Sequence, residues 1–240
     1  MNESLERLLS KKFFTAETNN TADFRQSTFT TSDFNIMTLG CSNAYGYGLK
    51  NEEVFDFIIK QEIEKDYNIK VSNWNLSLPG KGPDHCKIIF NEWAPKLKPN
   101  LAIFWWPAID RSFIFNKITN EFGGIKGKSD FIIESYRKYI STDEQDIYNW
   151  YYNCYLFVEN LAKVMDIELL HIRPRYDGKN FDISDILGDY INEFNFLPDN
   201  TTPLLDRVSD TDGHAGKKSH EQSGKNIYKF LKDKGYFDEI

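Results

Sequence analysis

The run from Leu101 to Trp106 constrains the fold of this chain most, because it is apolar throughout and ends at Pro107. A strand without alternating polar residues needs cover on both faces, which is typical of a central strand in a parallel sheet. Shorter apolar stretches at Asn35 to Leu39, Val71 to Leu76 and Ile167 to Ile172 have the same character. We therefore predict a parallel sheet that contains all of these strands.

Helix-length segments with apolar residues at helical spacing separate the strands. We expect these helices at Glu52 to Tyr67, His85 to Leu97, Thr142 to Met165 and Gly216 to Lys234. The alternation predicts a three-layer, flavodoxin-like α/β/α sandwich with helices on both faces of the sheet. Because the chain has no internal repeat and no low-complexity tract, we expect one domain over residues 33–240. The polar residues 1–32 predict an extended arm that its phenylalanines anchor to this domain.

Charge, hydropathy and cysteine usage exclude several classes of protein. The 240-residue chain carries a net charge of -7, from 36 Asp and Glu against 29 Lys and Arg, so we expect no nucleic-acid partner. No stretch reaches the roughly 18 apolar residues of a transmembrane helix, and the N-terminus lacks a signal-peptide core, so we expect no membrane association. The 3 cysteines, Cys41, Cys86 and Cys154, fit neither a disulfide framework nor a CxxC metal site. We expect a cytoplasmic location.

Loops beyond the carboxyl ends of parallel strands are where such sheets bind ligands. The first strand runs into Gly40-Cys41-Ser42-Asn43. A serine there, close to the start of a helix, lies where free backbone N–H groups favour the negative charge that a nucleophile develops. The same residues also suit an ordinary turn or helix cap. A phosphate-binding loop is disfavoured, because GxxxxGK[ST] and the third glycine of GxGxxG are absent.

The loop after the second strand contains Gly80 and Gly82. Glycines at this edge of the sheet can present backbone N–H groups to an oxyanion without obstruction by a side chain. An ordinary loop in which Asp84 caps the following helix is the alternative.

The segment before the last helix combines two carboxylates with two histidines: Asp210, Asp212, His214 and His220. These side chains are the ingredients of a general base oriented by an acid. They would also suit a divalent metal ion, and a solvated Asp-Gly turn is a further alternative. Because no HExxH-type pair accompanies them, we favour the acid–base interpretation and expect no metal and no cofactor.

Taken in order, these three segments resemble the SGNH (GDSL-type) hydrolase superfamily. Gly40-Cys41-Ser42 is similar to its first block, residues Trp74 to Gly80 to its second, and Asp212 to His220 to its last. The resemblance implies Ser42 as nucleophile, His214 as base, Asp212 as orienting acid, and the N–H groups of Ser42 and Gly80 as oxyanion donors. It also implies hydrolysis of a small-molecule or carbohydrate ester, such as an O-acetyl group.

Within this superfamily the chain resembles the subgroup found in bacteriophage and viral genomes, which implies a location in the host cytoplasm or the virion. The residues that carry this finer resemblance are Asp23-Phe24-Arg25, the Gly-Cys-Ser block and the tryptophan-rich strand that ends near Arg111.

Two departures from the family pattern bear on activity. The third block of the family supplies an Asn, whereas this chain has Pro107-Ala108-Ile109-Asp110-Arg111. Losing one oxyanion donor costs about 10²- to 10³-fold in rate, so Asn43 or Arg111 is expected to bind the oxyanion or substrate instead. The alternative is a catalytically weak or inactive binding or structural module, such as a virion-associated protein.

The second departure is spacing, because the family's common DxxH arrangement is absent at His214. Asp210 is therefore an alternative acid, and His220 an alternative base.

Three further candidates have structural interpretations. Cys41 is expected to be buried, since neighbouring residues that leave a strand point in different directions and only one of Cys41 and Ser42 can face the cleft. His85 opens a predicted helix and His171 lies near a strand end, so we expect hydrogen-bonded structural roles for both.

Overall fold

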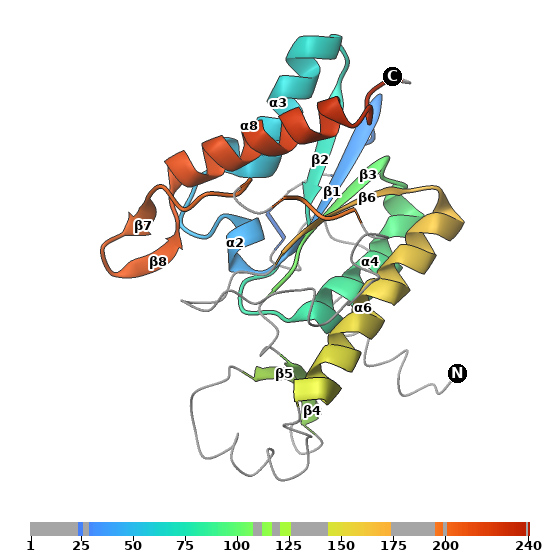
Figure 1. Cartoon of the computed structure of the whole chain (residues 1–240), viewed down its shortest axis with the longest axis vertical. Coiled ribbons are helices and arrows are strands. Elements are labelled where there is room, and N and C mark those ends of the chain that lie inside the picture. The colour runs from blue at the N-terminus through green and yellow to red at the C-terminus, as the bar shows by residue number, and fades with distance from the viewer. Residues whose placement is uncertain are drawn as a thin grey trace.

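The computed structural model describes residues 24–25, 29–107, 112–116, 121–125, 144–173, 195–198, 201–238 and 240. Its central sheet has 4 parallel strands in the order β2-β1-β3-β6 (Figure 1). They are β1 (Phe34–Gly40), β2 (Val71–Asn75), β3 (Leu101–Trp105) and β6 (Glu168–Ile172). The predicted strands and their parallel arrangement are confirmed.

Strand β3 lies inside the sheet, as its continuous apolar sequence predicts. Ile103 pairs with Thr38 of β1 on one side and with Leu170 of β6 on the other. All residues of β3 are buried, and its side chains alternate between two hydrophobic clusters. Phe104 belongs to one cluster and Trp105 to the other, so the strand is covered on both faces.

Helices cover both faces of this sheet. Helices α3 (Phe55–Tyr67) and α8 (Lys217–Asp233) pack together on one face, and α4 (Pro83–Leu97) and α6 (Glu144–Met165) pack together on the other (Figure 1). The predicted three-layer α/β/α fold is confirmed. The layers are tied to the sheet by aromatic contacts, with Phe90 against Phe104 at 5.1 Å and Phe55 against Trp105 at 5.2 Å between ring centroids.

Local sequence sets where the helices end and how closely they pack. Pro83 opens α4, where its missing N–H costs no hydrogen bond. Asn68 ends α3 in the left-handed conformation at φ 55°. On α8, a Cβ at Gly224 would lie 2.7 Å from the carbonyl oxygen of Phe55, so only glycine permits α8 to approach α3 this closely.

Several short elements add to those that the sequence predicts. They are α2 (Ser42–Tyr45), η1 (Asn51–Glu53), the hairpin β4 (Ser112–Asn116) with β5 (Glu121–Ile125), and the hairpin β7 (Arg207–Ser209) with β8 (Asp212–Ala215). Elements of three to five residues are too short to show a hydrophobic period, which explains why sequence reasoning misses them.

The described part of the N-terminal arm packs on the domain. Phe24 is buried and meets the Trp93 ring of α4 edge-on at 5.8 Å, and Phe29 lies 5.0 Å from the same ring. The hydroxyl of Ser72 in β2 donates to the carbonyl of Thr30 at 2.6 Å. The boundary between arm and domain at residue 33 stays a prediction.

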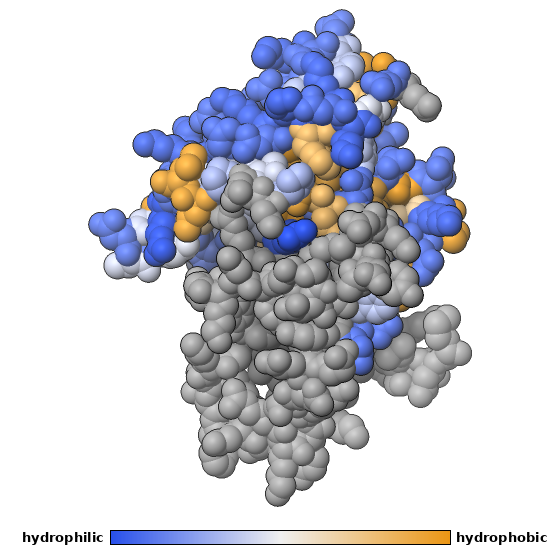
Figure 2. All heavy atoms as spheres, in the orientation of Figure 1, coloured by the Kyte–Doolittle hydropathy of each residue, from blue (hydrophilic) through white to orange (hydrophobic). Residues whose placement is uncertain are grey.

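The outer faces of α3 and α8 are mainly hydrophilic (Figure 2). Among the described helices, none has the length and apolar character that crossing a membrane requires.

Candidate active site

A tight turn after β1 carries Ser42. Cys41 is buried and extended, and Ser42 is the first residue of α2 and 6% exposed. A Cβ at Gly40 would lie 2.5 Å from both the carbonyl oxygen of Trp105 and the Cβ of Ala44. Glycine at this position therefore allows α2 to start directly against the end of β3. The expected burial of Cys41 is confirmed.

The loop after β2 runs beside this turn. The N–H of Leu76 donates to Thr38 at 2.8 Å, and the N–H of Leu78 donates to the Gly40 carbonyl at 3.1 Å. These bonds continue the parallel pairing beyond the strands and bring the loop to the carboxyl edge of the sheet. Gly80 follows in that loop with φ 75°, a left-handed conformation that favours glycine.

Asp212 and His214 form an acid–histidine pair on β8. The Nδ1 of His214 lies 2.5 Å from Oδ1 of Asp212, and the His214 backbone N–H donates to the same oxygen at 3.0 Å. These two hydrogen bonds, the backbone one first, lower the pKa of Asp212 below its ordinary value. Residues two apart share a face of a strand, so the short spacing brings the two side chains together.

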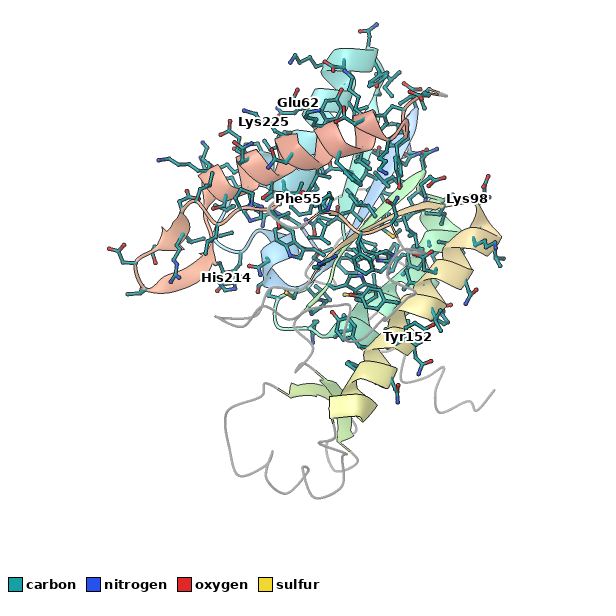
Figure 3. All side chains as sticks on the ribbon, in the orientation of Figure 1. Phe55, Glu62, Lys98, Tyr152, His214 and Lys225 are labelled. Carbon is teal, nitrogen blue, oxygen red and sulfur yellow. The ribbon has the colours of Figure 1, made fainter. Side chains whose placement is uncertain are left out.

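The turn that carries Ser42 packs against the β7–β8 hairpin. The Tyr47 ring lies 5.1 Å from the His214 ring, and a Cβ at Gly48 would meet the Val208 side chain at 2.6 Å. The N–H of Tyr47 in turn donates to the Ser42 carbonyl at 3.1 Å. Figure 3 shows His214 beside α2. Two segments far apart in the sequence thus meet at one edge of the sheet.

The other members of the C-terminal cluster lie elsewhere. Asp210 is exposed in the turn between β7 and β8, and the carboxylate bound to His214 is that of Asp212. His220 is 1% exposed, and its Nδ1 accepts the N–H of Phe55 at 3.3 Å, so it caps the start of α3. Within the described ranges, no three His, Cys, Asp or Glu side chains gather as metal ligands. The four residues of the metal alternative, Asp210, Asp212, His214 and His220, are therefore not brought together.

Of the further binding candidates, Asn43 is partly exposed on α2 and its carbonyl accepts the N–H of Gly46 at 3.2 Å. Arg111 lies outside the described residues, together with positions 108–110.

His171 and His85 have structural positions. Trp106 Nε1 donates to His171 Nδ1 at 2.8 Å, and His171 Nε2 lies 2.7 Å from Glu159 Oε1, so the expected hydrogen-bonded role of His171 is confirmed. His85 is buried at the start of α4. Its pKa is lowered to about 3, mainly by burial and to a smaller extent by the charge of Lys81.

The sequence does not indicate the roles of three polar residues behind the turn. Asn75 Nδ2 donates to the Ala44 carbonyl at 2.8 Å, and Arg25 donates to the carbonyls that follow. Asp56 is buried in the first turn of α3. Burial raises its pKa to about 6, although the hydrogen bonds and charges around it lower the pKa. Each is distant in sequence from Ser42, so sequence proximity does not connect it to this turn.

Asp206, also missed, holds the start of α8. Its carboxylate accepts the N–H groups of Lys218 at 3.0 Å and Ser219 at 2.8 Å, and the Ser219 hydroxyl at 2.7 Å. A Cβ at Gly216 would lie 2.7 Å from this carboxylate. Asp206 therefore fixes the helix start that follows β8.

Comparison with known proteins found no matching family model and no matching curated protein sequence. Solved structures do match. A putative lipolytic protein of the G-D-S-L family from Desulfitobacterium hafniense has a TM-score of 0.55 at 16% identity, covering 83% of this chain and 100% of its own. The psychrotrophic esterase EstA from Pseudoalteromonas sp. has a TM-score of 0.54 at 11% identity, covering 84% and 98%.

An acetylxylan esterase from Geobacillus stearothermophilus is also similar, with a TM-score of 0.52 at 12% identity over 87% of this chain and 97% of its own. Similarity at this level of identity establishes the architecture. The chain therefore has the three-layer fold of SGNH (GDSL-type) hydrolases.

Proposed function

We propose that this protein is a serine ester hydrolase in which Ser42 is the nucleophile, His214 the general base and Asp212 the orienting acid. The observation that carries the proposal is the 2.5 Å contact between His214 Nδ1 and Asp212, on a hairpin packed against the turn of Ser42. A carboxylate at Nδ1 selects the tautomer in which Nε2 is free to accept a proton.

The proposed reaction is acyl transfer to water. His214 Nε2 takes the hydroxyl proton of Ser42 as Oγ attacks the ester carbonyl, and the backbone N–H groups of Ser42 and Gly80 stabilise the oxyanion. Collapse of this intermediate expels the alcohol, which receives the proton from His214. Water then attacks the acyl-enzyme, His214 takes a proton from it, and the acid leaves as Oγ regains that proton.

The proposed substrate is a small acyl ester, such as an O-acetyl group on a carbohydrate. The acetylxylan esterase among the similar structures supports this class. We also propose that the chain is related to the subgroup in bacteriophage and viral genomes. The Phe24-Arg25 and Gly40-Cys41-Ser42 segments support that relationship.

A fluorophosphonate probe tests the proposal directly, because it labels serine nucleophiles activated by a neighbouring base. We expect labelling of the full chain and hydrolysis of p-nitrophenyl acetate, both lost in Ser42→Ala and both insensitive to a chelator. The adjacent Cys41→Ala variant is the control and should keep both.

Absence of labelling and hydrolysis in the wild-type chain would instead support the alternative, a binding or structural module with a weakened site. The sequence Pro107 to Arg111, which replaces the Asn-containing third block, is the observation that favours it.

A further inference from the structure

The carbonyl groups at the end of α2 are bound by a side chain from the N-terminal arm. Helix α2 has only 4 residues, so its last carbonyls have no partner within the helix. Arg25 Nη1 donates to the carbonyls of Tyr45 at 2.8 Å and Gly46 at 3.0 Å, and Nη2 donates to the Leu49 carbonyl. The guanidinium also lies over the Tyr45 ring, 5.0 Å from its centroid. One side chain thus ties together the segment Tyr45–Leu49.

The arm brings Arg25 to this place through its neighbour. Phe24 is buried against Trp93 of α4, on the opposite face of the sheet from α3. The backbone at residues 24–25 is therefore fixed on the domain while the guanidinium reaches the turn. Ordering a long arginine side chain costs less once its backbone is held.

A buried carboxylate balances the charge of Arg25. Asp56, in the first turn of α3, interacts electrostatically with Arg25 and also receives a hydrogen bond from Asn75. Asn75 donates in addition to the Ala44 carbonyl at 2.8 Å. The carbonyls of α2 and its following turn are consequently held by two side chains that share Asp56 as a partner. A charge in such a partly buried place needs a partner of this kind.

The segment held by Arg25 is connected to both Ser42 and His214. It directly continues α2, which begins at Ser42, and the ring of its Tyr47 lies 5.1 Å from the His214 ring. A displacement of Tyr45–Leu49 would therefore alter the position of Ser42 relative to His214.

We infer that Arg25 is a positioning residue for the nucleophile turn, holding the carbonyls of Tyr45, Gly46 and Leu49 so that Ser42 faces His214. This inference rests on the proposed function of Ser42. It makes the N-terminal arm a part of the active site. The forked guanidinium matters for this role, because a lysine ammonium is a single point and cannot bind three divergent carbonyls in the same way.

The test compares Arg25→Met and Arg25→Lys with Phe29→Ala in the full chain. Phe29→Ala is the matched control, because it removes arm packing on Trp93 without removing a bond to the turn. Two readouts are needed: hydrolysis kinetics with fluorophosphonate labelling of Ser42, and hydrogen exchange at the amides of Gly46, Tyr47 and Leu49. These amides donate within the turn, to Asn43, Ser42 and Gly46.

We expect Arg25→Met to lower kcat and the labelling rate about 10- to 100-fold, with little change in KM, because misplacement of a reacting group by about 1 Å costs rate rather than binding. Exchange of the three amides should accelerate in parallel. Arg25→Lys should recover the rate only in part and serves as the test if the Met variant does not fold. Phe29→Ala should stay within about twofold of wild type in kcat and labelling.

Equal labelling rates and equal exchange in Arg25→Met, Arg25→Lys and Phe29→Ala would overturn the inference. If the wild-type chain lacks Ser42-dependent labelling, the proposed function fails and the exchange data alone decide. Accelerated exchange confined to the arginine variants then supports the positioning of the turn, and unchanged exchange overturns it.

Discussion

His214 Nδ1 lies 2.5 Å from Asp212 Oδ1, and both side chains project from the same short strand β8. Asp212 is the carboxylate next to the imidazole because residues two apart lie on one face of β8, whereas Asp210 lies in the turn before this strand. A carboxylate at Nδ1 favours the tautomer that is protonated there, which leaves Nε2 to take the Ser42 proton in the proposed reaction.

Replacement of Asp212 by Asn should therefore impair catalysis strongly. The amide retains the shape of the carboxylate but no longer selects the productive tautomer, and we expect kcat for p-nitrophenyl acetate to fall about 10²- to 10⁴-fold. Asp210→Asn is the matched control and should remain within about twofold of wild type. A loss confined to the Asp210 variant would instead identify Asp210 as the acid.

Because of Asp56, the free energy of unfolding should decrease as the pH rises from about 4 to 6. Burial, opposed by hydrogen bonds from Asn75 and the Phe57 N–H and by the charge of Arg25, raises its pKa from 3.8 to about 6. A carboxyl group with a raised folded-state pKa stabilises the protein fully below the unfolded-state pKa, and this contribution is lost as pH rises from about 4 to 6. The Asp56→Asn variant should lack this pH-dependent contribution to stability.

Denaturant unfolding of both proteins across pH measures the effect. The free energy of unfolding of Asp56→Asn, minus that of wild type, should increase by about 3 kcal/mol between pH 4 and pH 7. Asp66→Asn is a control of opposite sign. Hydrogen bonds from Lys232 and Tyr228 lower the pKa of Asp66, so its contribution is present near neutral pH and is lost as pH falls. A difference for Asp56→Asn that does not vary with pH would contradict the raised pKa.

His220 should matter for folding and not for catalysis. Its Nδ1 accepts the N–H of Phe55, and its ring lies 6.2 Å from Trp105 in a buried position. His220→Ala leaves that buried N–H without its acceptor, so unfolding free energy should fall by about 1–3 kcal/mol. Labelling of Ser42 well below the melting temperature should persist.

The His214→Ala variant should show the reverse pattern, with labelling lost and stability nearly unchanged, because His214 is partly exposed. Loss of labelling in a folded His220→Ala protein would restore His220 as the general base.

The sequence indicates structure where a continuous run of residues is buried. It does not indicate contacts between residues that are far apart in the chain. Leu101 to Trp105 could be identified as a central strand because cover on both faces leaves an unbroken apolar run. The Asp212–His214 pair could be suggested because its members are close in the chain. Arg25 stands out in the sequence only as part of a family-like motif, since its carbonyl partners lie some 20 residues away. His220 was grouped with His214 by proximity in sequence, although the start of α8 turns it toward α3.

Gly40 should be the least replaceable residue of the nucleophile turn. An added methyl group would lie 2.5 Å from the Trp105 carbonyl oxygen and 2.5 Å from Ala44 Cβ, and the first of these is backbone of the central strand. Gly40→Ala must therefore push α2 away from β3, which should lower the free energy of unfolding by about 1–3 kcal/mol and slow labelling of Ser42. Denaturant unfolding and labelling kinetics measure the two effects.

Gly213 provides the matched comparison within the same site. Its added Cβ would meet only the flexible end of Arg207, at 3.9 Å, so Gly213→Ala should change stability by no more than about 0.5 kcal/mol. Adding Ala44→Gly to Gly40→Ala removes one of the two clashes and leaves the carbonyl of Trp105 in place. The double variant should consequently recover part of the lost labelling rate but not all of it. Full activity of Gly40→Ala alone would mean that the close approach of α2 to β3 does not set the position of Ser42.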